Sequence, residues 1–294
     1  MAAETYLLLT NQLLTRNNPS VVISAGASAG SVTDNGYNEQ CIVKPNFATS
    51  WKAPNGTNDN YIAINGGSAG WLGTTAGDRV FFALAYDARG SHQNTITLNS
   101  DSTDNPAGTF TQVKATITTV KTAPCVFIAS FLLPAGGKQY YRIQLTNANR
   151  SGGTILPKLY YAGMYRVSAG DDALRLMTDR NQPTAPGMLE QFGRNGVVEA
   201  SSMEVYSNKN GSPGQTVEVA LKPSRETVWT ILRDALYGMN VAQEAFFVQF
   251  EGLKNADTAN CGLVRVASNK WGSTRQYDAE YDTILYLNTE AQPL

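Results

Sequence analysis

The amino-acid sequence predicts a mainly β protein: an N-terminal jelly-roll β-sandwich over residues 1–167, a connector over 168–196, and a smaller α+β domain with one amphipathic helix over 197–294. Short strand-like runs separated by turn residues fill the first half, with no helical pattern between them, which is typical of a two-sheet architecture. One run, Val80 to Tyr86, is apolar on both faces and predicts a strand covered on two sides. Clear helical spacing of apolar residues occurs in the second half, at Arg225 to Met239.

The strands of the first half follow from alternation and from the turn residues that bound them. Val113, Ala115 and Ile117 alternate with polar residues, which predicts a half-buried antiparallel strand. Val126 to Leu133 is apolar on both faces and ends before a proline and a pair of glycines. In chain order the predicted runs are residues 6–14 (a strand or a short helix), 21–23, 41–43, 61–64, 80–86, 96–98, 113–117, 126–133, 141–145 and 155–163.

The second half predicts a strand pair, a helix and further strands. Residues 197–206 and 215–221 are expected to pair across a turn rich in Asn and Gly. Ser224 is a suitable N-cap for the helix, and the apolar stripe predicts that Leu232 is buried against a sheet. The strands expected after the helix are residues 246–250, 263–266 and 283–287. Strand, helix and strands in this order indicate an α+β unit.

Several spaced motifs in the first half resemble one family. Asn46-x-x-Thr-Ser-Trp51-x-Ala-Pro precedes a polar loop, Tyr61-Ile-x-Ile-x-Gly66, an apolar strand and Asn94-Thr-Ile-x-Leu98. Gln139-Tyr-Tyr-Arg-Ile-Gln-Leu145 and a closing strand at 155–163 follow. Over residues 5–167 this order resembles the discoidin-like, or galactose-binding-like, jelly roll, closest to the divergent versions in tail and baseplate proteins of tailed bacteriophages. The family often has Asp-Leu-Gly where this chain has Asn-Gly-Gly after the Tyr-Ile strand, so a different turn is expected there.

Composition and charge exclude several classes of protein. Hydrophobic residues make up 42% of the 294 residues and charged residues 16%, so the surface must consist mainly of neutral polar residues. The net charge of −1 and the lack of a basic run argue against nucleic-acid binding. The start of the chain lacks the basic region of a signal peptide, and no stretch is apolar for long enough to span a bilayer. We therefore expect synthesis in the cytoplasm and no membrane insertion.

No set of residues has the spacing of a catalytic or metal site, so we expect no enzymatic activity and no cofactor. Cys41, Cys125 and Cys261 are far apart and odd in number, which favours small buried side chains over a disulfide or a metal centre. His92 is the single histidine and follows a Gly-Ser pair, which is typical of a surface loop.

The acidic residues also favour structural interpretations. Asp278, Glu280 and Asp282 alternate ahead of the last predicted strand and are expected to face solvent or a partner. A glycosidase would need two carboxylates flanking a cleft, which a sequence does not reveal. Asp101, Asp104 and Asn105 could supply oxygens to Ca²⁺, but their spacing matches no EF-hand and favours a turn.

Three residues are the candidates for contact with a partner or a glycan: Trp71, Arg89 and His92. Trp71 lies in a Gly-rich loop, where an exposed indole is costly without something to cover it. Its indole is expected to pack against the sandwich, to form a protein interface, or to stack on a sugar.

The leading functional hypothesis is a structural virion protein of a tailed bacteriophage, in the tail tip, baseplate or fibre-attachment region. It rests on the resemblance and the low charge, and it implies other virion proteins as partners, a ring-shaped homo-oligomer, and assembly in the bacterial host cytoplasm. The alternative is a carbohydrate-binding module that reads a host surface glycan, because the galactose-binding-like fold often presents sugar-binding loops. A glycan-degrading enzyme is the third class.

Overall fold

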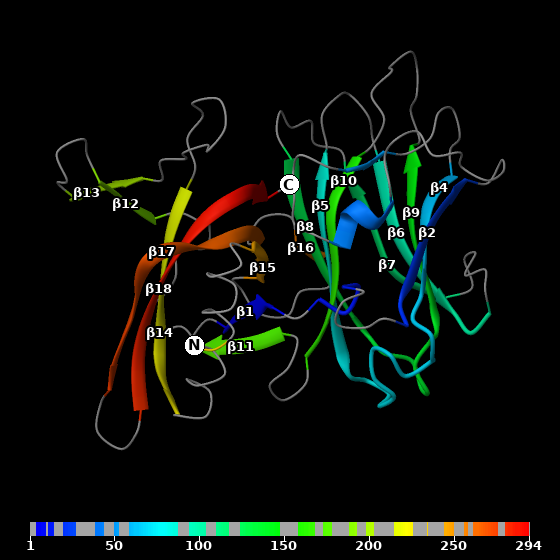
Figure 1. Cartoon of the computed structure of the whole chain (residues 1–294), viewed down its shortest axis with the longest axis horizontal. Coiled ribbons are helices and arrows are strands. Elements are labelled where there is room, and N and C mark those ends of the chain that lie inside the picture. The colour runs from blue at the N-terminus through cyan, green and yellow to red at the C-terminus, as the bar shows by residue number, and fades with distance from the viewer. Residues whose placement is uncertain are drawn as a thin grey trace, which may run out of the picture. The chain divides into compact units, whose positions relative to one another are not determined.

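The computed structural model describes residues 4–9, 11–14, 20–27, 39–43, 50–52, 59–87, 94–103, 110–117, 124–147, 158–167, 173–177, 188–192, 198–202, 215–225, 234, 244–249, 256–257, 261–275 and 280–293. In these residues the chain is mainly β, with antiparallel sheets and very little helix (Figure 1). None of their helices is long and apolar enough to cross a membrane. The chain divides into two compact units, which we call the sandwich unit (Thr10–Asp172, Lys254–Thr258 and Leu294) and the terminal unit (Met1–Leu9, Ala173–Leu253 and Ala259–Pro293).

The sandwich unit contains two antiparallel sheets. The first has five strands in the order β2-β4-β9-β6-β7. In the second, β5 pairs with β8 and β10, β10 pairs with β3, and β16 pairs with β8. The bounds are β2 Val22–Ala27, β3 Trp51–Lys52, β4 Asp59–Asn65, β5 Arg79–Asp87, β6 Asn94–Asp101, β7 Phe110–Ile117, β8 Pro124–Leu132, β9 Tyr140–Asn147, β10 Lys158–Arg166 and β16 Ala256–Asp257.

One hydrophobic core fills the space between these two sheets. It combines Ile62 and Ile143 from the first sheet with Phe82, Leu84 and Phe127 from the second. The even-numbered side chains of β5 point into this core, and the odd-numbered Phe81, Ala83 and Ala85 on its other face are also fully buried. The double coverage predicted for residues 80–86 is therefore confirmed.

One short element of the sandwich unit differs from the prediction. Residues 41–43 were expected to form a strand but belong to a 3₁₀ helix, η1 (Glu39–Val43). Ile42 and Val43 are buried, and the Gln40 side-chain amide donates to the carbonyl of Ile23 at 2.8 Å. A short apolar run can bury its side chains through one helical turn as well as through a strand, so periodicity does not separate the two.

The terminal unit is built on a second antiparallel arrangement. Its strands pair in the order β11-β1-β15-β17-β18, β14 pairs with β18, and β12 pairs with β13. Their bounds are β1 Glu4–Leu8, β11 Ala173–Met177, β12 Met188–Phe192, β13 Val198–Ser202, β14 Gln215–Arg225, β15 Phe246–Gln249, β17 Cys261–Arg275 and β18 Glu280–Pro293.

Three features of this unit differ from the sequence interpretation. The first nine residues belong to it, because β1 pairs with β11 and β15. The segment taken as a connector carries β11 and β12. The strands expected to pair with each other across residues 208–214 pair elsewhere, β13 with β12 and β14 with β18, because long-range register decides pairing.

The predicted amphipathic helix lies almost entirely outside the described residues. Asp234 is helical, whereas Leu232 and the rest of the apolar stripe are not described. Ser224, the expected N-cap, and Arg225 instead continue β14, where they pair with Tyr281 and Glu280.

Candidate functional site

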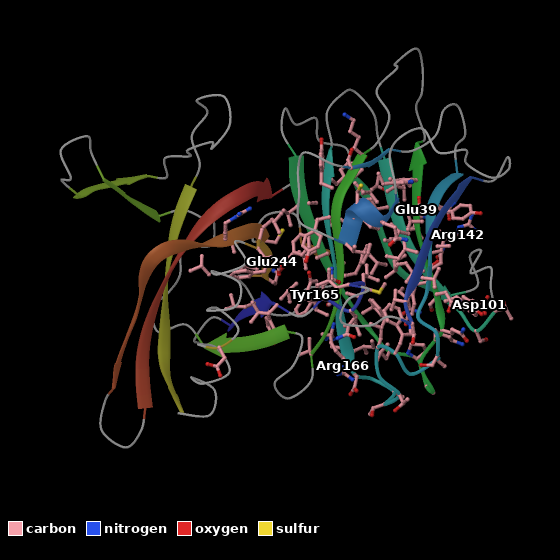
Figure 2. The ribbon with its side chains drawn as sticks, viewed as in Figure 1. Glu39, Asp101, Arg142, Tyr165, Arg166 and Glu244 are labelled. Carbon is pink, nitrogen blue, oxygen red and sulfur yellow. The ribbon has the colours of Figure 1, made fainter. Side chains whose placement is uncertain are left out.

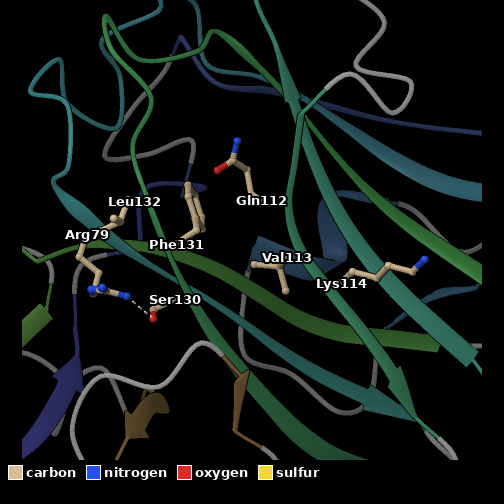
Figure 3. A pocket seen from close by; sticks show the side chains of 7 residues that line it. All are labelled: Arg79, Gln112, Val113, Lys114, Ser130, Phe131 and Leu132. Carbon is tan, nitrogen blue, oxygen red and sulfur yellow. Dashed lines mark hydrogen bonds between the residues drawn. The ribbon is translucent and has the colours of Figure 1, made fainter.

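A cleft of about 360 Å³ lies in the sandwich unit where β7 of one sheet meets the end of β8 of the other. This volume falls within the range of about 300–1,000 Å³ that is usual for ligand sites. Figure 3 shows that polar and apolar side chains share its lining. The lining residues are Arg79, Gln112, Val113, Lys114, Ser130, Phe131 and Leu132.

Arg79 is the charged group that is held in place. It is the first residue of β5, opposite Leu132 in the register with β8, and this pairing brings it beside Ser130. An N–H of its guanidinium donates to the Ser130 hydroxyl oxygen at 2.9 Å, drawn as a dashed line in Figure 3. Ser130 is 4% exposed and Arg79 is half-buried, so a fixed strand position orients the guanidinium.

The β7 side of the cleft carries an amide and a second cation. The Gln112 amide nitrogen donates to the buried Ser100 hydroxyl at 2.9 Å, which directs the amide relative to the strand. Lys114 is exposed, and Figure 3 shows its side chain extending away from Arg79 and Ser130. The two cations therefore lie at different ends of the lining.

The apolar part of the lining joins the cleft to the core. Phe131 and Val113 are core residues, and Phe131 lies 6.1 Å from the ring centroid of Tyr141 at a tilt of 43°. Leu132 is 51% exposed, one of two large hydrophobic side chains with this much exposure among the described residues. Donors beside an exposed apolar surface are the combination that binding sites for polar ligands with apolar faces use.

Trp71 is placed in the core rather than at the surface. Its indole is 8% exposed, meets the Tyr141 ring edge-on at 5.7 Å, and donates its N–H to the Lys138 carbonyl at 3.1 Å. Packing against the sandwich, one of the three expected roles, is thus the observed one. Little of the ring remains for a sugar or a partner.

The Asn-Gly-Gly turn explains how the indole fits. The Asn65 side-chain oxygen accepts from the amide of Gly67 at 2.9 Å, and Gly67 has a φ of 79°, which favours glycine. A Cβ on Gly66 would overlap the Trp71 ring. The glycine at position 66 therefore makes room for the indole.

The remaining candidates fall into two groups. Arg89, His92, Asp278 and the residues after Thr103 in the 101–105 loop lie outside the described residues. The Asp101 carboxylate accepts from the amides of Ser102 and Thr103, which is a turn. No cluster of metal-ligating side chains occurs among the described residues.

The first sheet also carries a cation–π contact between two of its own strands. The Arg142 guanidinium lies 3.5 Å from the centroid of the Tyr61 ring, a cation–π contact between β9 and β4. Figure 2 shows Arg142 on this sheet, apart from Arg166 and Tyr165. Arg142 is 8% exposed, so this contact serves packing of the sheet.

Sequence reasoning did not single out Arg79, Ser130 or Gln112. Arg79 and Ser130 are 51 positions apart and meet only through the β5–β8 register. The sequence signal for Ser130 is its position as a polar residue inside the two-faced apolar run 126–133.

No protein-family model matches the chain, and no curated protein sequence matches it. Among solved structures, it is similar to chitosan-binding module 1 from a chitosanase/glucanase of Paenibacillus sp. IK-5, at 20% identity and a TM-score of 0.34 over 53% of this chain and 98% of the module. The CBM32 of AlyQ in complex with 4,5-unsaturated mannuronic acid is 21% identical, with a TM-score of 0.31, over 49% of this chain and 93% of that one.

A GH29 fucosidase from Ruminococcus gnavus in complex with fucose is 16% identical, with a TM-score of 0.34, over 54% of this chain. The match spans 27% of the fucosidase, about a quarter of its length. At these identities and TM-scores the likeness assigns neither a family nor a function to this chain. None of these three neighbours is a phage tail or baseplate protein.

Proposed function

We propose that the sandwich unit is a jelly roll of the galactose-binding-like type and that the chain binds carbohydrate. The observation that carries the proposal is the cleft at β7 and β8, where hydrogen-bonding groups and an exposed apolar surface lie together. Sugars present hydroxyl groups around the ring edge and C–H groups on the ring face. A site for them therefore needs fixed donors and acceptors beside an apolar contact.

The described lining supplies both kinds of contact. Arg79, Ser130 and Gln112 can bond to hydroxyl groups, and each of the three already has a protein hydrogen bond that restricts its side chain. Leu132 offers the apolar surface. The described lining contains no carboxylate or imidazole to act as a general acid or base, which favours binding over hydrolysis.

The test uses a pair of matched variants with a glycan array and calorimetry. Leu132→Ser removes the exposed apolar side chain of the cleft, and Val22→Ser removes the other, which is 58% exposed on β2. We expect binding to at least one glycan class, weakened in Leu132→Ser and unchanged in Val22→Ser. An array with no bound glycan, or equal binding by both variants, would overturn the proposal.

The second candidate is the structural role in a phage virion. The low charged fraction of 16% favours a surface largely occupied by neighbouring subunits, and the motif resemblance points to the same class. In this role the protein would form a homo-oligomeric ring that contacts other virion proteins, and the cleft would bind a host surface glycan. Mass photometry of the purified protein, with proteomics of purified virions, tests this: monomers alone, together with absence from virions, would exclude it.

A further inference from the structure

We infer that the cleft at β7 and β8 selects a saccharide that carries a negative charge, a carboxylate or a sulfate group, and that Arg79 is the residue that binds it. This inference rests on the proposed carbohydrate binding and adds the chemical class of the ligand. It is carried by the juxtaposition of a half-buried guanidinium, a buried hydroxyl and a second cation in one cleft.

No acidic side chain of the described lining balances the positive charge of the cleft. Among the described residues, the Arg79 side chain has one hydrogen bond, to the neutral Ser130 hydroxyl, and no ion pair. Lys114 has neither a hydrogen bond nor an ion pair among the described residues, and the described lining contains no Asp or Glu. A half-buried guanidinium without a counter-ion is stabilised when a ligand supplies one.

The geometry of Arg79 suits an oxyanion. A guanidinium is planar and offers five N–H donors in a fixed fork, which matches the two oxygens of a carboxylate or a sulfate. The buried Ser130 hydroxyl accepts a hydrogen bond from an N–H at one end of the fork, which holds the guanidinium in one orientation. Ser130 is therefore a positioning residue, and Arg79 is the ligand-contacting one.

Lys114 contributes through its charge rather than through a direct contact with the same group. Figure 3 places its side chain away from the Arg79–Ser130 pair. An exposed cation beside the binding group raises the local concentration of an anionic chain, and salt screens this effect. The inference thus predicts a large role for Arg79 and a small, salt-sensitive one for Lys114.

The experiment compares four probes on the full chain: a short oligogalacturonate, its methyl ester, a sulfated galactan oligosaccharide and the corresponding neutral galactan. The ester keeps the sugar and removes the charge. We expect tighter binding to an acidic probe than to its neutral counterpart by about tenfold or more. Comparison of the carboxylated and sulfated arms identifies the anionic group.

The variants separate the residues. Arg79→Gln should weaken binding of the acidic probe by about tenfold or more and abolish the preference, and Lys114→Gln should weaken it by roughly twofold to fivefold at low salt only. Lys158→Gln removes one positive charge from β10, outside the cleft, and should leave binding unchanged. If Arg79→Gln does not fold by circular dichroism, Arg79→Lys replaces it, which keeps the charge but removes the fork and should weaken binding without abolishing it.

The outcomes distinguish this inference from the proposed function. Binding of neutral and acidic probes with equal affinity, or undiminished acidic binding in the folded Arg79 variant, would overturn the inference and leave carbohydrate binding intact. Absence of binding to all four probes and to the array would overturn both.

Discussion

The structure makes a quantitative prediction about a buried amide in the sandwich unit, Asn11. Its side chain is 0% exposed and forms hydrogen bonds with three backbone groups. The amide nitrogen donates to the carbonyl of Ala162 at 2.8 Å, and the side-chain oxygen accepts from the amides of Leu13 at 3.0 Å and Met164 at 3.2 Å. These hydrogen bonds connect the start of the sandwich unit to β10.

The change Asn11→Ala leaves these three backbone groups without their partner. A buried group that loses its hydrogen bond costs about 1–3 kcal/mol, and a water in the vacated space recovers part of this. We therefore expect a loss of about 3–5 kcal/mol in the free energy of unfolding, which corresponds to a fall in Tm of about 6–20 °C. Urea unfolding and calorimetry measure both quantities.

Two further variants isolate the cause. Asn11→Asp fills the same volume but places an oxygen opposite the Ala162 carbonyl and buries a charge, so a loss at least as large is expected without a cavity. Thr116→Ala, at an exposed position whose hydroxyl has a contact of 3.4 Å with Thr95, should change stability by less than about 0.5 kcal/mol. A loss below about 1 kcal/mol in Asn11→Ala would refute the hydrogen-bond reasoning.

Two other changes in the same core have expected effects. Gly66→Ala forces the Trp71 ring out of its position and should lower the free energy of unfolding by about 1–3 kcal/mol more than Gly77→Ala does. At Gly77 a Cβ meets nothing within 4 Å, and only the φ of 88° is unfavourable. An equal urea midpoint in the two variants would contradict this expectation. Tyr141→Phe should keep or raise Tm, because the Tyr141 hydroxyl is buried without a hydrogen-bond partner among the described residues; a loss above about 1 kcal/mol would reveal a partner. Burial also raises the pKa of Tyr141 above its ordinary value of 10.0, so the native state keeps a proton that the unfolded chain loses. The contribution of the protonated Tyr141 to the free energy of unfolding is complete below pH 10 and falls as the pH rises above 10. Unfolding midpoints should therefore decline less steeply in the alkaline range for Tyr141→Phe than for the unmodified chain.

The central strand of the sandwich could be predicted because its residues carry the signal themselves. Val80 to Tyr86 is apolar on both faces, bounded by turn residues, and too short for a helix of the usual length. The same local reasoning did not distinguish a strand from a 3₁₀ helix at Cys41 to Val43, where three residues set no period.

The arrangement of the terminal unit depends on contacts that local patterns do not contain. Glu4 to Leu8 pairs with residues 173–177 and 246–249, so its place is decided by partners more than 160 positions away. Register between distant strands also decides the cleft, since Arg79 meets Ser130 only through the β5–β8 ladder. The sequence pattern singled out Trp71 as a possible contact residue, but its indole packs in the core beside Gly66.

Lys114 and Arg79, the two cations of the cleft, differ in whether the fold alone explains their presence. Lys114 lies on β7, which ends its sheet among the described residues, and a lysine on an edge strand protects the edge from pairing with other chains. Arg79 begins β5, which pairs on both sides, so no such protection is needed there. The one side-chain hydrogen bond of the half-buried Arg79 among the described residues is to a neutral serine hydroxyl, so no ion pair there offsets the desolvation of its charge. The anionic ligand inferred for this cleft would supply the missing counter-ion, so binding measurements on Arg79 variants test that inference more directly than those on Lys114.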